Sequence, residues 1–305
     1  MTLDTSTTSS TTPPSKSTEP VTLLILGAGW TYQFLQRRLC DEKIAHAATT
    51  TSGRDDTIVF KFDPESDDRE PFNRLPKAEC VLVTFPLKGK GPSKKLLDMY
   101  ETTHPGSSGT KWIQLGSTGI WTAATWNSAS SPIDPANERG AAEDELISLG
   151  GCVLNLAGLY GGAREPRNWV ARVAKTKEQL ASKGALHLVH GVDVARAVVG
   201  VLKHKADAKN FFGRRWIVAD CVSYDWWSLV WDWTGERHDN DDHPGRDQDE
   251  ERLREKSKYG QWVWELMDEN NVRGLPRSVE ILGRKLDSRE FWNAIGLLPE
   301  KTLGR

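Results

Sequence analysis

The stretch VTLLILGAGWTYQFL, residues Val21 to Leu35, decides the fold. Its apolar run, Val21 to Leu26, ends in glycine, which is typical of a buried strand that leads into a turn. Residues 31–43 then carry apolar side chains at helical spacing. A strand, a glycine turn and a helix in this order form the first half of a βαβ unit.

The glycine turn matches two of the three glycines of the dinucleotide-binding fingerprint G-x-G-x-x-G. Gly27 permits the tight turn, and Gly29 lets the backbone approach a diphosphate at the helix N-terminus. We therefore expect the amides of residues 27–31, including those of Trp30 and Thr31, to bind the diphosphate of a cofactor. Tyr32 fills the third position, where glycine normally permits close helix–strand packing, so its side chain must turn away or push the helix outward. The alternative is a glycine turn that binds no ligand.

The end of the second predicted strand contacts the ribose in this type of site. An NAD site places a carboxylate there, which binds the 2′-hydroxyl. Here Thr51 and Ser52 are uncharged and Arg54 follows, a combination that favours the 2′-phosphate of NADP. Asp55 and Asp56 lie close enough that a small shift in register would favour NAD instead, and Arg54 as a plain loop cation is the other alternative.

Strands and helices continue to alternate along the chain, which predicts an α/β fold: a Rossmann-like parallel sheet with helices on both faces. A smaller C-terminal portion, helical and rich in tryptophan, is expected to pack over the cofactor cleft and bind substrate. Further strands are predicted at 44–52, 57–63, 80–86, 111–121, 152–162 and 215–220, and helices at 93–103, 139–150 and 191–204.

Composition excludes several classes of protein. The 305 residues are 38% hydrophobic and 27% charged, with a net charge of -2, which gives no electrostatic reason to expect nucleic acid or an anionic membrane as a partner. No apolar run reaches the roughly 18 residues that span a bilayer. The four cysteines are widely spaced and predict neither a zinc site nor disulfides, so we expect reduced thiols in a cytoplasmic protein.

Three segments are expected along the chain. Residues 1–20 are rich in Ser, Thr and Pro and are predicted to be a disordered tail. Residues 21–235 form the predicted NAD(P)-binding domain, and residues 236–305 form a charged insertion and a helical cap. The stretch RHDNDDH, residues 237–243, is interpreted as a solvated loop, with no metal site expected.

Four stretches carry a resemblance when taken in order: LILGAGW, WIQLGSTGIW, LNLAGLYGGAREP and LVHGVDVARAVVGVL. Their order and spacing resemble the extended and atypical short-chain dehydrogenase/reductases, the NAD(P)-dependent epimerase/dehydratase family. The resemblance covers about residues 21–235. It implies a Rossmann sheet, hydride transfer with NADP or NAD, a small organic substrate and, in many members, a homodimer.

The resemblance also implies a catalytic serine, tyrosine and lysine, of which only the serine is present. Ser117 fills the serine position, with Thr118 beside it. Arg139 falls near the tyrosine position and Glu143 near the lysine position. No tyrosine of the chain has lysine four residues later, so the usual proton-transfer pair is absent.

Other positions follow from the same resemblance. Phe85 and Pro86 are expected under the nicotinamide, and Gly158, Leu159 and Tyr160 along the nicotinamide and substrate pocket. The proton donor there is expected to be Tyr160, water or a residue not placed by the sequence. Arg164 is expected on an anionic substrate, with a surface ion pair as the alternative. His190 and Asp193, before and within the helix at 191–204, are interpreted as a packed imidazole and a helix cap. The leading hypothesis is an oxidoreductase or epimerase-like enzyme, and the alternative is an inactive NADP sensor that binds a protein partner.

Overall fold

The computed structural model describes residues 19–204, 211–235 and 248–304. Most of the predicted tail, the stretch 237–243 and part of the charged insertion therefore lie outside the described residues. The described part contains no helix long and apolar enough to cross a membrane.

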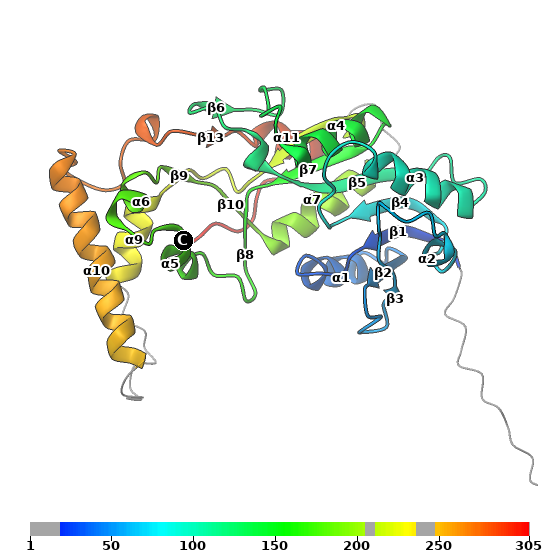
Figure 1. Cartoon of the computed structure of the whole chain (residues 1–305), viewed down its shortest axis with the longest axis horizontal. Coiled ribbons are helices and arrows are strands. Elements are labelled where there is room, and N and C mark those ends of the chain that lie inside the picture. Colours follow the sequence, from blue (N-terminus) through cyan, green and yellow to red (C-terminus); the bar gives the residue numbers. More distant parts are fainter. Residues whose placement is uncertain (1–18, 205–210, 236–247, 305) are drawn as a thin grey trace, which may run out of the picture.

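A seven-stranded parallel sheet forms the centre of the molecule (Figure 1). The strand order is β11-β7-β5-β4-β1-β2-β3. From β1 the chain first adds strands on one side, to β3, and then on the other side, from β4 to β11, so the order of the parallel strands switches between β1 and β4, as in Rossmann folds. The strands are β1 (Val21–Leu26), β2 (His46–Thr50), β3 (Ile58–Val59), β4 (Ala78–Val83), β5 (Lys111–Ser117), β7 (Cys152–Leu156) and β11 (Arg214–Val218).

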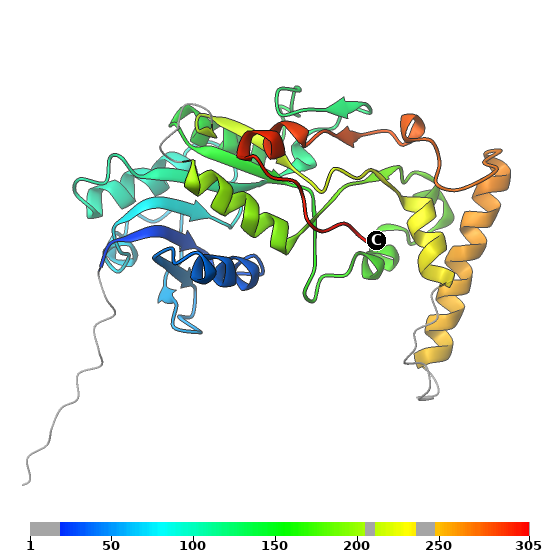
Figure 2. The same ribbon diagram turned by 180° about the vertical axis from the view of Figure 1, so that it is seen from behind.

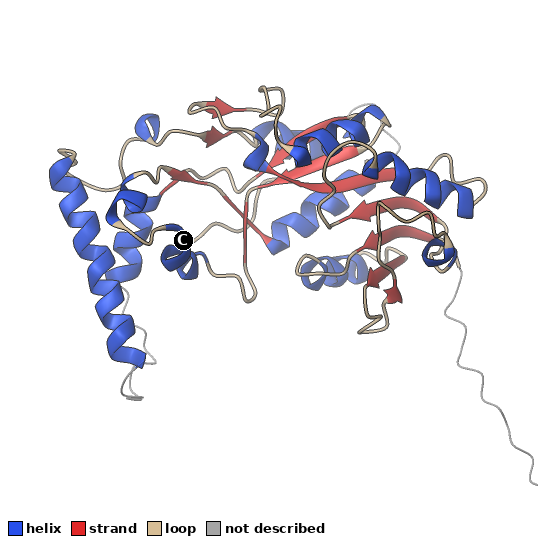
Figure 3. Ribbon diagram, viewed as in Figure 1, coloured by secondary structure: helices blue, strands red, loops and turns tan. Residues whose placement is uncertain are grey.

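Helices cover both faces of this sheet, as predicted (Figure 3). Alternate side chains of β1 enter two cores: Leu23 and Ile25 pack with α1, α7 and α11, whereas Leu24 and Leu26 pack with α2, α3 and α4. These helices are α1 (Tyr32–Asp41), α2 (Glu70–Asn73), α3 (Pro92–Thr103), α4 (Glu138–Ser148), α7 (Gly191–Lys203) and α11 (Arg289–Ile295).

The predicted strand 152–162 is two strands. β7 ends at Leu156, and β8 (Gly158–Tyr160) leaves the central sheet to pair with β10 (Leu188–His190). The backbone turns at Ala157, whose amide donates to the Val218 carbonyl of β11 at 3.0 Å. The predicted strand 111–121 likewise ends at Ser117, where the 3-10 helix η1 (Thr118–Ile120) begins.

A second helical portion stands at the end of the molecule opposite β2 and β3 (Figures 1 and 2). Trp226 and Trp227 are buried there, while Trp231 and Trp264 stack on each other at the surface. α9 and α10 pack together across the predicted boundary at 235/236. The elements are η2 (Pro166–Trp169), α5 (Val170–Val173), α6 (Lys177–Ala181), α9 (Trp226–Gly235) and α10 (Gln248–Glu269).

Short elements complete the chain. Two small sheets pair β9 with β12 and β6 with β13. The remaining bounds are β6 (Trp126–Asn127), β9 (Ala185–Leu186), β12 (Tyr224–Asp225), β13 (Lys285–Leu286) and the 3-10 helix η4 (Val279–Ile281).

Candidate active site

Gly27 makes the turn that the sequence predicts at the end of β1. Its φ of +97° is one that L side chains rarely adopt, and a Cβ there would lie 2.6 Å from Thr84 Oγ1. Thr84 Oγ1 donates to the Gly27 carbonyl at 2.6 Å, and the Gly27 amide donates to Thr49 Oγ1 at 3.0 Å. Glycine is thus required here to join β1 closely to β4 and β2.

Gly29 faces open space. A Cβ built on it has no heavy atom within 4 Å, so the fold itself does not require glycine at this position. In the described part of the chain, the amides of Trp30 and Thr31 donate to no protein acceptor. Free amides at the start of a helix suit an anion, and the turn therefore fits the diphosphate of a dinucleotide.

Tyr32 occupies the position of the third fingerprint glycine, and its side chain points away from the cavity beside the turn. Its ring packs against the core and makes an edge contact with His46, with 6.3 Å between ring centroids. It does not line the cavity beside the turn. The missing third glycine therefore leaves the anion-binding half of the turn open.

Trp30 connects the glycine turn to the loop after β8. Its Nε1 donates to the Gly161 carbonyl at 3.1 Å, and the Arg164 guanidinium lies 4.6 Å from the centre of its ring. Arg164 is thereby held next to the predicted diphosphate site.

Arg54 reaches the same turn from the loop after β2. Its Nη2 lies 3.4 Å from the Ala28 carbonyl, and its Nε lies 3.7 Å from an Asp55 carboxylate oxygen. Thr51 is exposed directly after β2 ends at Thr50. The structure therefore brings Thr51, Arg54 and the glycine turn together at one edge of the sheet.

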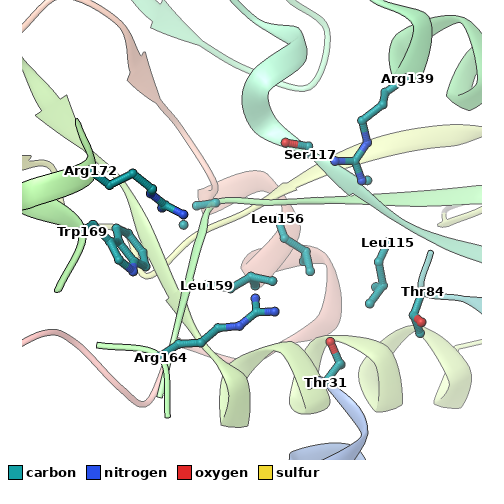
Figure 4. Close-up of a pocket in the computed structure, with 13 residues that line it drawn as sticks. Thr31, Thr84, Leu115, Ser117, Arg139, Leu156, Leu159, Arg164, Trp169 and Arg172 are labelled. Carbon is teal, nitrogen blue, oxygen red and sulfur yellow. The ribbon is translucent and has the colours of Figure 1, made fainter. Parts of the chain in front are cut away.

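A cavity of about 650 Å³ opens at the carboxyl ends of β1, β4, β5 and β7 (Figure 4). Of the residues that the sequence predicts at the site, Thr31, Ser117, Gly158, Leu159 and Arg164 line it. The lining residues are Thr31, Thr84, Leu115, Gly116, Ser117, Arg139, Leu156, Ala157, Gly158, Leu159, Arg164, Trp169 and Arg172.

At the end of β4, the residue that lines the cavity is the one before the predicted Phe85 and Pro86. Thr84, the first residue after β4, lines the cavity, whereas Phe85 and Pro86 do not. Phe85 instead stacks on Phe62 in the core, with 6.3 Å between ring centroids, and Pro86 is exposed.

Ser117 and Thr118 have different roles. Ser117 lines the cavity, and its Oγ accepts a hydrogen bond from the Gly119 amide at 3.2 Å, so its own proton is available to a ligand. Thr118 is buried and donates to the Leu156 carbonyl at 3.3 Å. The prediction of Thr118 as a substrate-binding residue is therefore replaced by a structural role.

Glu143, on α4, is fully buried and lies next to Ser117 on the side away from the cavity. One carboxylate oxygen accepts from the Ser117 amide at 3.3 Å, and the other from Asn155 Nδ2 at 2.7 Å. Burial raises the pKa of Glu143 above its ordinary value. One helical turn earlier, Arg139 enters the cavity beside Ser117 (Figure 4).

Tyr160 lies outside the cavity, contrary to its predicted role. It is buried with Leu188 and Tyr224, and its hydroxyl has no hydrogen-bond partner in the described part of the chain. Burial, together with the Asp220 and Asp193 carboxylates, raises its pKa. A phenol in these surroundings is poorly suited to give or take a proton at the cavity.

His190 is packed as predicted, with its ring in edge contact with Phe34 and Tyr160, but His190 rather than Asp193 caps the helix. His190 Nδ1 caps α7 by accepting from the Val192 amide at 3.2 Å. Asp193 is fully buried and accepts from the amides of Glu300 and Lys301, both at 2.9 Å. Asp193 thus anchors the C-terminal segment to α7.

Of the four charged or aromatic residues that line the cavity, the sequence predicts only Arg164 as a ligand contact, and Arg139, Trp169 and Arg172 are additional. Arg139 is expected only near the family's tyrosine position, and its side chain faces the cavity. Trp169 and Arg172 come from η2 and α5, whereas none of the described residues of α9 or α10 lines the cavity, so η2 and α5 replace the C-terminal helices as its neighbours.

No protein-family model and no curated protein sequence matches the chain. Solved structures do match over nearly its whole length. A short-chain dehydrogenase/reductase superfamily protein from Agrobacterium tumefaciens with bound NAD is 10% identical, with coverage of 92% and 93% of the two chains and a TM-score of 0.57. A UDP-N-acetylglucosamine 4-epimerase from Bacillus cereus is 12% identical, with coverage of 92% and 94% and a TM-score of 0.53.

Yeast methylglyoxal/isovaleraldehyde reductase Gre2, solved in complex with NADPH, also matches, with 13% identity, coverage of 92% and 94% and a TM-score of 0.51. These identities are low, and the likeness establishes the fold. The chain has a Rossmann-like fold similar to that of these solved structures, as its sequence predicted.

Proposed function

We propose that this chain binds NADP, or NAD in its place, along the carboxyl edge of the sheet and acts as an oxidoreductase or epimerase-like enzyme on a small organic molecule. The observation that carries the proposal is the glycine turn. Gly29 and the free amides of Trp30 and Thr31 make a place for a diphosphate, and Thr31 lines the same cavity as Ser117.

Arg54 supports NADP over NAD. It contacts the glycine turn from the end of β2, where the ribose binds in Rossmann folds, and a guanidinium there complements a 2′-phosphate. Asp55 pairs only loosely with Arg54, at 3.7 Å, and both side chains are largely exposed.

The proposed location is the cytoplasm. The four free cysteines support it, because thiols stay reduced there.

When bound, a reduced nicotinamide dinucleotide supplies a hydride to the carbonyl carbon of a substrate. The Ser117 hydroxyl is positioned to donate a hydrogen bond to the carbonyl oxygen, and Arg139 stabilises the negative charge that develops there. Water then protonates this oxygen, because neither a tyrosine nor a lysine is among the described residues that line the cavity.

An inactive NADP sensor is the second candidate. The observation that favours it is the replacement of the tyrosine and lysine by Arg139 and Glu143, the latter fully buried. In that case the cofactor shifts the conformational equilibrium of the chain and its affinity for a protein partner, without turnover.

Thermal unfolding with NADP, NADPH, NAD and NADH tests the proposal first, because a ligand that binds the folded state raises Tm. A rise in Tm with NADP or NADPH is expected, and the absence of any shift contradicts both candidates. Turnover across aldehydes, ketones and nucleotide sugars then separates them. An enzyme loses rate in the Ser117→Ala variant, whereas a sensor shows no turnover and keeps its cofactor affinity.

A further inference from the structure

The cavity holds three arginine side chains and no carboxylate. Arg139, Arg164 and Arg172 enter it from different sides (Figure 4), and no Asp or Glu is among the described residues that line it. This excess of positive charge stands in a chain whose net charge is -2. The cavity therefore complements anionic ligands.

These three guanidinium groups lack carboxylate partners among the residues that the structure describes. Other arginines in the same region do have partners: Arg215 pairs with Asp144 at 2.6 Å, and Arg167 with Glu165 at 2.6 Å. An arginine without a carboxylate partner in a cavity is available to a carboxylate or phosphate of a ligand.

Arg139 shows this most clearly. Its Nε is buried and has no hydrogen-bond partner in the described part of the chain. Buried polar atoms normally have partners, so an unpaired donor on a cavity-lining side chain suits an anionic group of a ligand. Glu143, one turn along α4, has both oxygens occupied by Ser117 and Asn155.

The three cations divide into two groups by position. Arg164 stacks on Trp30 next to the glycine turn, so it serves the diphosphate of the cofactor. Arg139 lies beside Ser117 at the end of β5, and Arg172 lies on α5 near Trp169. Two cations therefore remain for the substrate.

Resting on the proposed function, we infer that the substrate is a small carbonyl compound that carries a carboxylate or a phosphate. Arg172 binds its anionic group, while Ser117 and Arg139 bind its reacting oxygen. Guanidinium groups suit both anions because their paired N–H donors match two oxygens at once. This assignment moves the predicted substrate anchor from Arg164 to Arg172.

Calorimetric titration of the full chain, saturated with whichever of NADPH or NADH it binds, tests this inference. The probes are oxalate for the carboxylate and inorganic phosphate for the phosphate. The variants are Arg139→Gln, Arg139→Lys and Arg172→Gln, with Arg167→Gln as the matched control, since Arg167 lies outside the cavity lining and pairs with Glu165. Thermal unfolding identifies any variant that fails to fold, and Arg139→Lys keeps the charge where Arg139→Gln removes it.

The expected result is that one of the two probes binds the cofactor-loaded chain. Arg139→Gln and Arg172→Gln should each weaken that binding by about tenfold or more, while Arg167→Gln leaves it within about twofold. The cofactor affinity of Arg172→Gln should stay within about threefold of the parent value.

Two results would overturn the inference: no binding of either probe, or binding that all variants retain. A large loss of cofactor affinity in Arg172→Gln would also overturn it, because Arg172 would then belong to the cofactor site. Failure of the proposed function looks different, since the parent would then bind neither NADPH nor NADH. Oxalate or phosphate binding that Arg172→Gln abolishes in the cofactor-free chain would still support the anion site.

Discussion

Asn155 on β7 donates a 2.7 Å hydrogen bond to the buried Glu143 carboxyl group on α4, directly behind Ser117. The same amide group also donates to the Ser117 carbonyl at 3.2 Å. These bonds fix the cavity-lining end of β5 to β7 and α4, on the side away from the cavity. The space is tight, because a Cβ on Gly116 would lie 2.5 Å from both the Asn155 amide and the Glu143 carboxyl group.

This contact predicts energetic coupling between the two residues. Asn155→Ala and Glu143→Ala should each reduce the free energy of unfolding by roughly 1–3 kcal/mol, because each leaves a buried polar group without a partner. Urea unfolding of the single variants and the double variant should give a coupling energy of about 1–2 kcal/mol. Additive losses would contradict a direct interaction.

A second prediction concerns the ion pair that connects β12 to the chain before η4. Arg277 Nη2 lies 2.6 Å from the fully buried Asp225 carboxylate, and the Arg277 guanidinium lies 3.8 Å from the centre of the Trp227 ring. Arg277→Met should destabilise the chain by about 3–5 kcal/mol, since it leaves a buried charge unpaired.

The matched control for Arg277 is Arg289→Met, which removes an exposed pair with Asp287. Surface pairs contribute at most about 1 kcal/mol, so the control should change little. Equal effects of the two substitutions on urea unfolding would show that burial of the Asp225 pair is energetically unimportant.

The pH dependence of stability should depend on His187. This residue is buried, and its Nε2 accepts from the Leu286 amide at 3.2 Å, which requires the neutral ring. Burial, followed by the nearby cations Arg284 and Lys285, lowers its pKa from 6.5 to about 4. The unfolded chain therefore binds this proton more readily than the folded chain.

The stabilising contribution of a neutral His187 is complete above pH 6.5 and is lost as the pH falls towards 4. It should amount to about 3 kcal/mol over that window. His187→Gln keeps an acceptor but does not titrate, so its free energy of unfolding should fall less between pH 7 and pH 4 than that of the parent. Identical pH profiles by urea unfolding would contradict this assignment.

Cofactor preference should depend on Arg54. Arg54→Gln removes the only cation that the described structure places against the glycine turn from β2, so NADPH should bind about tenfold more weakly. NADH affinity should remain within about threefold, because it lacks the 2′-phosphate. Fluorescence titration with both cofactors measures the ratio. An equal loss for both would place Arg54 on a group that they share.

The sequence pattern correctly predicted the strands and turns whose conformation depends on neighbouring residues along the chain. The apolar run of β1 and the glycines after it specify a strand and a turn, and both occur where expected. The seven strands of the central sheet pair in parallel, as predicted, whereas their order was not predicted. Ser117, the last residue of β5, was placed at the site by the family resemblance, and it lines the cavity where parallel strands end together.

Features that depend on contacts between distant parts of the chain could not be predicted from the sequence. The run 152–162 is continuous in apolar character, and only its partners β11 and β10 show that it divides at Ala157. Tyr160 consequently lies in a hydrophobic cluster with Leu188 and Tyr224, and not in the pocket that the resemblance implied. Arg172 carries no local signal, because its position depends on how η2 and α5 pack against α9.

The glycine turn is the proposed cofactor site, and Gly29→Val tests this role directly. The fold leaves open space at Gly29, so this variant should unfold at the same temperature as the parent, as should Gly109→Val, a control with equally open space away from the cavity. Calorimetric titration with NADPH should show binding to the parent and to Gly109→Val, and at least about tenfold weaker binding to Gly29→Val. Undiminished NADPH binding by a folded Gly29→Val chain, or no binding of NADPH or NADH by the parent, would contradict the account.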